Sequence, residues 1–498
     1  MGDILQNLYY GLIPLLGVAP MLLIAIGVFV GIAAGAIPGI SPAMAVALFL
    51  PFTFAMEPTL GIVMLMGIYK GANYGGSITA VSINTPGTPS AAVTAFDGYP
   101  LARAGRAGEA MGISLYASVI GGLIGTLILI FFSVPLARVA LTFWPSEYFA
   151  LCVLGLTTVA TLGGSNWQKA LVTVMFGLML NTVGLDPIMG VRRYTFGVLR
   201  LYDGFHLIPV MIGLFALGEL FSNLEDYKAG EEKFEKISYK WPPLKYYWNL
   251  RGSITRASIV GTLIGIFPGA GGTIASFLAY DVEKRLSKQP ETFGKGAPEG
   301  VAAAEASNSS SVGGAMVPLL TLGIPGSSTT AVLIGALMIH NIQPGAEMFV
   351  KHPDIVYGIF MSMFIASFFM LAIGLVGGKL WVRITDLKRN ILYPFILTFT
   401  VVGSYAVNKS MFDVGVCFAF GIIGWLFKRY GFPVAPVVLG LVLGRIAEMN
   451  YRQALMIGGF ASFYTRPLTM ILFILSIASV VVPVIQKRRA ENRAKQAG

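Results

Sequence analysis

Two short stretches rich in Gly, Pro, Ser and Thr interrupt strongly apolar surroundings. They read Asn84-Thr85-Pro86-Gly87-Thr88-Pro89-Ser90 and Gly323-Ile324-Pro325-Gly326-Ser327-Ser328-Thr329. Proline removes an N–H donor from a helix, and glycine lets the backbone turn and approach a ligand closely. Backbone groups freed inside a membrane are tolerated only where protein or a polar cavity receives them. The two stretches therefore predict paired breaks in membrane helices that together form a binding site.

The chemistry of such a break favours an anion. A helix that restarts after the break presents free N–H groups and the positive end of its dipole, and Ser and Thr hydroxyls add adaptable donors. The residues predicted to bind an anionic substrate are Ser77, Asn84, Thr85, Pro86, Gly87, Thr88, Ser90, Pro325, Gly326, Ser327, Ser328 and Thr329.

A polar stretch precedes each break. Asn73 stands before Gly75-Gly76, and Asn308 stands before Gly313-Gly314. Amide and backbone carbonyl oxygens are hard ligands that suit a cation such as Na⁺. The residues predicted to bind a coupling cation are Asn73, Gly75, Asn308, Ser309, Ser310 and Glu305.

Each of these features has a plainer interpretation. Small residues also permit close helix packing in membranes, which accounts well for Gly121-Gly122. Glu305 and Lys70 are candidates because ionisable residues inside a membrane are usually functional. The alternative places them at the interface, where a lysine side chain reaches water. The three histidines have no metal-ligand spacing, so neither a transition-metal site nor a cofactor is expected.

The composition predicts the elements that position these residues. The chain has 498 residues, of which 55% are hydrophobic and 12% charged, whereas soluble domains carry about 25% charged residues. Several apolar stretches approach or exceed the ~20 residues of a spanning helix. They include residues 12–34, 113–134, 355–376 and 467–485. The predicted fold is an all-α polytopic membrane protein; long, non-alternating apolar segments exclude a porin-like barrel.

The net charge of +11 does not indicate a nucleic-acid partner. Lys and Arg crowd the ends of the apolar segments, as the positive-inside rule requires. The tail Lys487-Arg488-Arg489 is expected to be a cytoplasmic anchor, with binding to membrane lipid headgroups as the lesser alternative. Cys152 and Cys417 both lie in apolar segments and do not support a disulfide framework.

Internal similarity predicts a duplication. Residues 35–39 match 265–269, the break at Pro86 matches that at Pro325, and residues 209–214 match 436–441. The N-terminal tail has no Lys or Arg, whereas the polar linker between the halves is rich in both. The tail is therefore expected in the periplasm and the linker in the cytoplasm. An odd number of crossings in each half predicts two inverted repeats with broken or re-entrant helices.

These expectations divide the chain into five parts. They are a first transmembrane repeat (1–222), a polar cytoplasmic linker (223–253), a second transmembrane repeat (254–462), an extra C-terminal transmembrane helix (463–486) and a basic cytoplasmic tail (487–498).

Up to about residue 460, the chain resembles the large membrane subunit of the tripartite tricarboxylate transporter family. The motifs that carry the resemblance are Pro38-Gly39-Ile40-Ser41-Pro42, Asn73-Tyr74-Gly75-Gly76-Ser77, Asn84-Thr85-Pro86-Gly87-Thr88-Pro89, Pro268-Gly269-Ala270-Gly271-Gly272 and Pro298-Glu299-Gly300 with Glu305 and Asn308. The resemblance implies a multi-pass carrier of the bacterial inner membrane. It also implies a small four-helix membrane subunit, a periplasmic solute-binding protein, and organic carboxylates such as citrate as substrates.

The sequence thus predicts a secondary active transporter of an organic di- or tricarboxylate, coupled to Na⁺ or H⁺, rather than an enzyme. Two alternatives stay open: a channel for small anions, and an intramembrane enzyme using Asp186 and Asp281. The sequence does not choose among carboxylates, between the two ions, or between a rocking and an elevator mechanism. It also leaves homo-oligomer formation open.

Overall fold

The structure, a computed structural model, describes residues 2–162, 167–225, 242–269, 271–377 and 389–481. Helices dominate these residues, as predicted, and the strands within them are β1 (Gly184–Leu185) and β2 (Arg192–Arg193). The chain forms two compact units. Unit 1 comprises Met1–Arg138 with Met211–Trp425, and unit 2 comprises Val139–Val210 with Leu426–Gly498.

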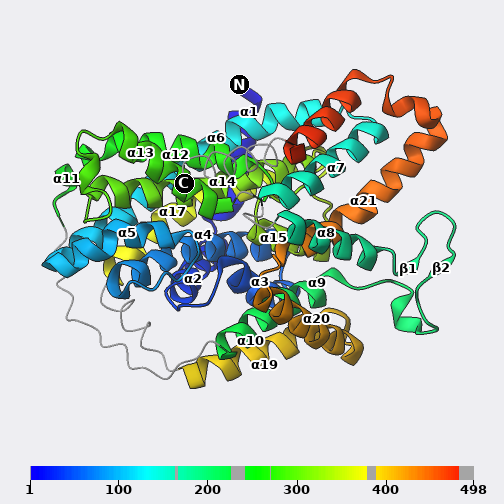
Figure 1. Ribbon diagram of the computed structural model, residues 1–498, viewed down its shortest axis with the longest axis horizontal. Coiled ribbons are helices and arrows are strands. Elements are labelled where there is room, and N and C mark those ends of the chain that lie inside the picture. Colours follow the sequence, from blue (N-terminus) through cyan, green and yellow to red (C-terminus); the bar gives the residue numbers. More distant parts are fainter. Residues whose placement is uncertain (1, 163–166, 226–241, 270, 378–388, 482–498) are drawn as a thin grey trace, which may run out of the picture. The chain divides into compact units, whose positions relative to one another are not determined.

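Unit 1 holds both predicted breaks (Figure 1). Its helices are α1 (Gly2–Leu12), α2 (Val18–Gly35), α3 (Pro42–Thr53), α4 (Pro58–Ile83), α5 (Ala91–Leu101), most of α6 (Ala107–Ala140), α10 (Gly218–Glu225), α11 (Leu244–Asn249), α12 (Arg251–Ile266), α13 (Gly271–Leu286), α14 (Pro298–Leu322), α15 (Ser328–Ile339), α16 (Met348–Lys351), α17 (Pro353–Val376), α19 (Arg389–Asn408) and most of α20 (Met411–Arg429). Its 3₁₀ and π-helical segments are Ile13–Leu16, Ala102–Arg106, Ile212–Leu217 and Pro290–Thr292.

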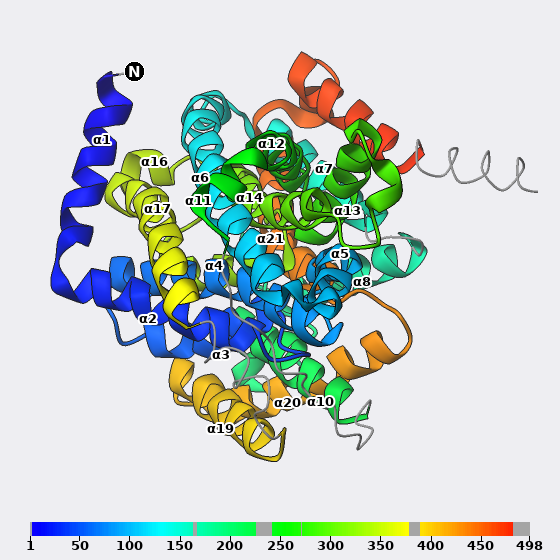
Figure 2. The same cartoon turned by 90° about the vertical axis from the view of Figure 1, so that its left-hand side faces the viewer.

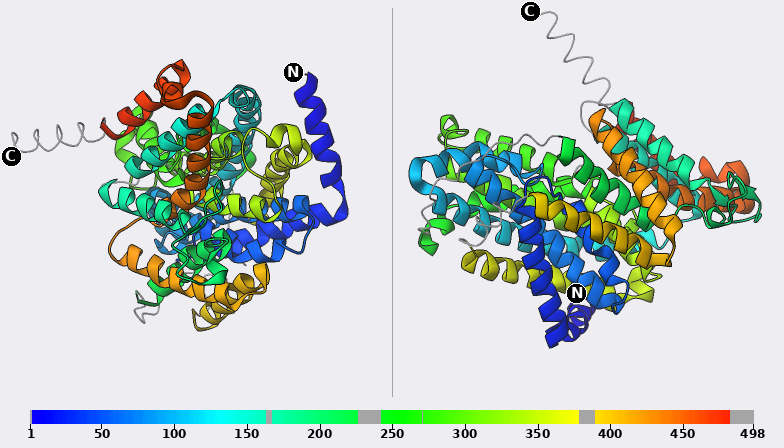
Figure 3. Two further views of the ribbon diagram at one scale, coloured as in Figure 1. Left: turned by 90° about the vertical axis from the view of Figure 1, so that its right-hand side faces the viewer. Right: turned by 90° about the horizontal axis from the view of Figure 1, so that it is seen from below.

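Unit 2 contains the strand pair. Its helical elements are α7 (Pro145–Leu162), α8 (Trp167–Asn181), most of α9 (Leu207–Met211), α21 (Ala435–Gly458), a further helix Pro467–Val481, and the 3₁₀ segments Leu199–Leu201 and Gly459–Phe463. The helices α8 and α21 lie side by side (Figure 3), because Gly177 and Gly440 let the two backbones come into contact.

Five helices among the described residues are long and apolar enough to cross a membrane, which confirms the prediction of a multi-pass membrane protein. They are Val18–Gly35, Ala91–Ala140, Leu207–Glu225, Pro353–Val376 and Met411–Arg429. The bent pair Ala435–Phe463 and Pro467–Val481 meets at 78° and counts as a sixth if it forms one span.

The predicted span at 12–34 is wrong at its start. The α-helix α1 ends at Leu12, a 3₁₀ turn containing Pro14 follows, and Gly17 is extended. Proline removes a helical hydrogen bond and glycine weakens the helix, so the spanning helix begins only at Val18. The N-terminal helix α1 instead packs along α17, where Gly11 meets the backbone of Tyr357 (Figure 2).

Two close helix pairs form the centre of unit 1: α2 with α4, and α12 with α14. Gly31 of α2 and Gly71 of α4 each lie against the partner's backbone, without room for a side chain. In the second pair, Gly265 of α12 and Gly314 of α14 are placed in the same way. Small residues allow membrane helices to approach closely, and this packing fixes the helices that lead into both breaks.

The connections that follow the two helix pairs are alike, as their packing is. The α2 helix turns into α3 through Gly39, with φ of 92°, and α12 turns into α13 through Gly269, with φ of 82°. The Gly-Pro clusters are therefore tight connections between helices. The inverted relation between the repeats and their boundaries remain predictions. Most of the predicted linker, residues 226–241, and the whole tail, 487–498, lie outside the described residues.

Candidate functional site

The first break leaves the helical path at the predicted place. Helix α4 ends at Ile83, and Asn84 adopts a left-handed conformation with φ of 55°. The N–H of Gly87 donates to the carbonyl of Gly76 over 3.1 Å, which folds the loop back onto α4. Gly87 is also pressed against the backbone of Gly35, so only glycine fits there. Its position favours a packing role over direct contact with substrate.

The second break has the same form. Helix α14 ends at Leu322, Gly323 has φ of 70°, and α15 begins at Ser328. The N–H of Gly269 donates to the carbonyl of Gly326 over 3.0 Å, so the α12–α13 connection is attached to the break.

Some of the N–H groups predicted to be free at the helix starts have partners within the chain. Ser327 and Thr330 form a capping box, in which each side chain accepts from the other's backbone N–H. After the first break, the N–H of Ala91 donates to Thr88 and that of Ala92 to Pro89. These donors are therefore already occupied. Ser327 and Thr330 thus cap the helix after the second break, whereas after the first break only the Thr88 hydroxyl, among the described residues, accepts from a backbone N–H, that of Ala91.

Residues from both breaks meet around the α12–α13 connection. A Cβ built at Gly272 would lie 2.8 Å from Oδ1 of Asn308, 3.1 Å from Oγ of Ser311 and 3.7 Å from Cβ of Ser90. A Cβ at Gly271 would lie 3.9 Å from Cβ of Ser327. Glycines at 271 and 272 thus let the start of α13 come close to polar groups from both halves of the sequence.

The asparagines predicted to bind a cation lie in the middle of α4 and α14 and touch. Nδ2 of Asn308 donates to the carbonyl of Asn73 over 3.2 Å, and Nδ2 of Asn73 donates to the carbonyl of Tyr69 over 2.9 Å. Oδ1 of Asn308 has no hydrogen-bond partner within the described part of the chain, although the residue is only 1% exposed. A buried, unpaired amide oxygen is costly unless a ligand satisfies it.

The hydroxyl of Tyr69 extends this polar group toward the second break. It lies 3.1 Å from Oγ of Ser327 and also hydrogen-bonds Thr329. Ser90 lies 3.2 Å, Oγ to Oγ1, from Thr88. The site that we define here, the polar centre, consists of Tyr69, Asn73, Thr88, Ser90, Asn308, Ser311, Ser327 and Thr329 with Gly271 and Gly272.

Other predicted site residues face elsewhere. Ser77 hydrogen-bonds Ser114 of α6, and Gly75 packs against α2 at Ile32. The side chain of Ser310 points to α12. Asn84 is exposed at the outer end of the first break.

Glu305 and Lys70 are buried, with 0% and 1% exposure, so neither lies at an interface as the alternative interpretation held. The Glu305 carboxylate accepts hydrogen bonds from Thr94 of α5 and, over 2.8 Å, from Ser118 of α6. The Lys70 ammonium donates to the carbonyl of Met363 over 3.1 Å and to Ser367 over 2.6 Å. Both ionisable side chains are thus fixed inside unit 1, on the helices that carry Asn73 and Asn308.

Asp97 links the two broken elements. Its buried carboxylate accepts from the hydroxyl of Tyr280 over 2.8 Å and from the backbone N–H groups of Gly294, Gly296 and Ala297. Since Asp97 lies on α5 and Ala297 caps α14, this carboxylate ties the helix after the first break to the helix before the second. Asp97 is not one of the predicted site residues.

Comparison with known proteins decides the family. The sequence matches the Tripartite tricarboxylate transporter TctA family over residues 21–439. This chain belongs to the TctA family. It is 38% identical over 494 residues to an uncharacterized 52.8 kDa protein of Agrobacterium vitis from the TAR-I ttuC' 3' region, covering 99% of this chain and 98% of that relative. No solved structure matches the chain.

A second Agrobacterium vitis relative is described as an uncharacterized protein in the TAR-II ttuC' 3' region. It is 36% identical over 234 residues, which is 47% of this TctA-family chain and 97% of the relative.

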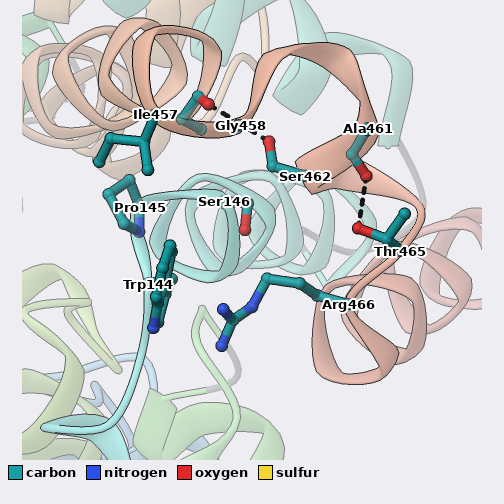
Figure 4. Close-up of a pocket in the computed structure, with 10 residues that line it drawn as sticks. Trp144, Pro145, Ser146, Ile457, Gly458, Ala461, Ser462, Thr465 and Arg466 are labelled. Carbon is teal, nitrogen blue, oxygen red and sulfur yellow. Dashed lines mark hydrogen bonds between the residues drawn. The ribbon is translucent and has the colours of Figure 1, made fainter.

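This TctA-family chain also has a cavity of about 200 Å³ in unit 2 (Figure 4). It is lined by residues that include Trp144, Ser146 and Arg466. The guanidinium of Arg466 already bonds Glu147 over 2.8 Å and lies 4.4 Å from the centre of the Trp144 ring. Ligand pockets usually measure about 300–1,000 Å³. The cavity is small and its charge is paired, so it does not compete with the polar centre as a substrate site.

Several members of the polar centre escaped the sequence analysis. Tyr69 stands four residues before Asn73, which places both near one face of α4. Ser311 stands three residues after Asn308 in the same way. Helical spacing from Asn73 and Asn308 could therefore have identified Tyr69 and Ser311. The glycines at 271 and 272 belong to the motif Pro268–Gly272, but they were not predicted to be neighbours of Asn308 and Ser327.

Proposed function

We propose that this membrane component of a tricarboxylate transporter is a secondary active carrier. It imports an organic di- or tricarboxylate, such as citrate, across the bacterial inner membrane. Transport is coupled to Na⁺ or H⁺, and a periplasmic binding protein delivers the substrate to this chain and a small membrane subunit.

One observation carries the proposal: two chain breaks, distant in sequence, contribute Ser90 and Ser327 to the surroundings of the α12–α13 connection. Hydroxyl groups of Tyr69, Ser90 and Ser327 are neutral donors for carboxylate oxygens. These hydroxyls support the polar centre as the proposed substrate site, with residues of both breaks around it.

The cation is placed at Asn308. Its Oδ1 is an oxygen ligand of the kind that Na⁺ takes, and the neighbouring Ser311 hydroxyl adds a second oxygen. A positive ion there stabilises a nearby carboxylate by direct attraction, which is strong where water is scarce. That attraction explains why substrate and cation would bind together.

The test is uptake of radiolabelled organic acids into vesicles that contain the chain, its small membrane partner and the binding protein, across a Na⁺ series and a pH series. A carrier gives saturable uptake that runs against the substrate gradient when an ion gradient is imposed. Flux that never exceeds the substrate gradient would support a channel and contradict the proposal.

A matched pair of variants locates the substrate site. Ser327→Ala removes a hydroxyl of the polar centre, whereas Ser462→Ala removes a partly buried hydroxyl in unit 2. We expect the first to raise the substrate concentration for half-maximal uptake and the second to leave it unchanged. Equal behaviour of the two variants would exclude Ser327 from the site.

A further inference from the structure

The connection between α8 and α9, residues 182–206, forms a projecting hairpin in unit 2, here called the β-hairpin (Figure 1). Its strands pair antiparallel, Gly184 with Arg193 and Leu185 with Arg192. The N–H of Leu185 also donates to the carbonyl of Tyr202 over 2.8 Å. The hairpin is therefore an ordered element.

Four charged side chains fasten the hairpin to α21. The guanidinium of Arg193 binds Glu448 over 2.7 Å, and that of Arg452 binds Asp186 over 2.9 Å and Glu448 over 2.7 Å. Asp186 further accepts from the backbone N–H groups of Ile188 and Met189. Because two positive and two negative groups compensate one another, this network holds the base of the hairpin without adding net charge to it.

Beyond this base, the hairpin presents large apolar side chains to the surroundings. Phe196 is 85% exposed, Met189 76%, Leu199 73% and Tyr194 65%. Tyr194 and Phe196 also have positive φ values of 51° and 48°, which bulky residues rarely adopt. Strain of this kind persists only where the surrounding structure enforces it, and it gathers at functional sites.

The exposed side chains of the β-hairpin have the composition of a protein interface. Aromatic residues, Met and Arg are enriched at interface centres, and here Arg192 and Arg200 are exposed among the apolar side chains. A bilayer is a poor fit, since a hairpin with irregular backbone does not satisfy its polar groups in hydrocarbon. The fitting partner is a protein with an apolar hollow edged by carboxylates, which would receive the rings and pair with the arginines.

Chain order and the charge pattern predict the side of the membrane. The helix Leu207–Glu225, which is long and apolar enough to cross a membrane, stands in the chain between the hairpin and the basic linker. The linker region carries seven Lys and Arg residues, and the positive-inside rule predicts that it is cytoplasmic; they are Lys228, Lys233, Lys236, Lys240, Lys245, Arg251 and Arg256. On this orientation the hairpin faces the other compartment.

We propose that the β-hairpin is a docking surface for the soluble binding protein of the tripartite system, with Phe196 as the central contact. The inference rests on the proposed delivery of substrate by such a protein. It adds where that protein binds and which chemistry it must present.

The test measures binding rather than transport. The full chain and the small membrane subunit are placed in nanodiscs, and the affinity of the purified binding protein is measured by biolayer interferometry. We expect Phe196→Ala to weaken binding by about tenfold or more, as loss of a central aromatic contact does. Leu286→Ala, at a side chain 61% exposed in unit 1, is the matched control and leaves binding unchanged.

The outcomes separate the two proposals. If the wild-type chain binds no soluble protein encoded beside it, delivery itself fails. If it binds and Phe196→Ala binds equally well, the docking surface is wrong. A photo-reactive phenylalanine at position 196 gives an independent reading: cross-links to the binding protein support the inference, whereas cross-links to lipid alone or to the small membrane subunit alone overturn it.

Discussion

Asn308 of α14 and Asn73 of α4 are in direct contact: Nδ2 of Asn308 donates to the backbone carbonyl of Asn73 over 3.2 Å. In the sequence each asparagine stands before a Gly-Gly pair, but the match of Pro86 with Pro325 aligns Asn73 with Val312 and not with Asn308. The helix packing gives the same register, because Gly75 of α4 meets Ile32 of α2 and Gly314 of α14 meets Thr262 of α12. The asparagines thus form one composite group, and Asn308 supplies its unpaired oxygen.

Asn308→Ala should raise the Na⁺ concentration for half-maximal uptake if Na⁺ is the coupling ion. Loss of a ligand contact worth ~1.4 kcal/mol corresponds to about a tenfold rise. Asn249→Ala is the matched control, since Asn249 carries the same amide but is exposed on α11. Uptake in vesicles across a Na⁺ series measures both variants. Unchanged Na⁺ dependence in Asn308→Ala would move the cation site elsewhere.

A substitution of the glycine at the first break should destabilise the protein far more than a substitution of a glycine with free space around it. Gly87→Val should destabilise unit 1 by about 1–3 kcal/mol, because its side chain would collide with the backbone of Gly35 and Gly76. We expect lost uptake together with a lower melting temperature in detergent. Gly415→Ala is the control, since nothing lies within 4 Å of a Cβ there. A Gly87→Val protein of normal stability but without uptake would instead support direct contact with substrate.

The breaks themselves were predictable, whereas the polar centre was only partly so. Pro-Gly followed by Ser and Thr encodes a local interruption, and the chain leaves the helix at Asn84 and Gly323 as expected. The capping box at Ser327 and Thr330 is equally local, but its spacing was not recognised. Contacts such as Tyr69 with Ser327, 258 residues apart, depend on how helices rotate and pack, and one sequence does not encode that visibly.

The Glu305 side chain is buried between α14, α5 and α6, so its removal and its replacement by glutamine should lower stability to different degrees. Glu305→Ala leaves the hydroxyls of Thr94 and Ser118 without their acceptor, which costs about 1–3 kcal/mol for each buried group left unpaired. Glu305→Gln keeps an acceptor and should be milder. Melting of the purified variants in detergent measures the difference. Equal melting temperatures for the two variants would show that the hydroxyls find other partners.

The acidity of Asp186 predicts how the β-hairpin responds to pH. The backbone N–H groups of Met189 and Ile188, aided by Arg452, lower the pKa of Asp186 to about 2. A lowered pKa means that the carboxylate stabilises the fold above its ordinary pKa of 3.8, and that this stabilisation is lost as pH falls through about 2. The hairpin should therefore stay attached to α21 throughout the physiological range.

Asp186→Asn should release the hairpin at every pH, because a neutral amide does not compensate Arg452 and Arg193. Hydrogen exchange followed by mass spectrometry should show faster exchange for peptides that contain Ile188 and Met189. Asp281→Asn is the control: Asp281 pairs with Arg285 on an exposed face of α13 and should not affect the hairpin. If Asp186→Asn leaves exchange in the hairpin unchanged, the charge network is not what holds it. Weaker binding of the soluble partner to the same variant, with Phe196 intact, would link the fixed base to the docking surface.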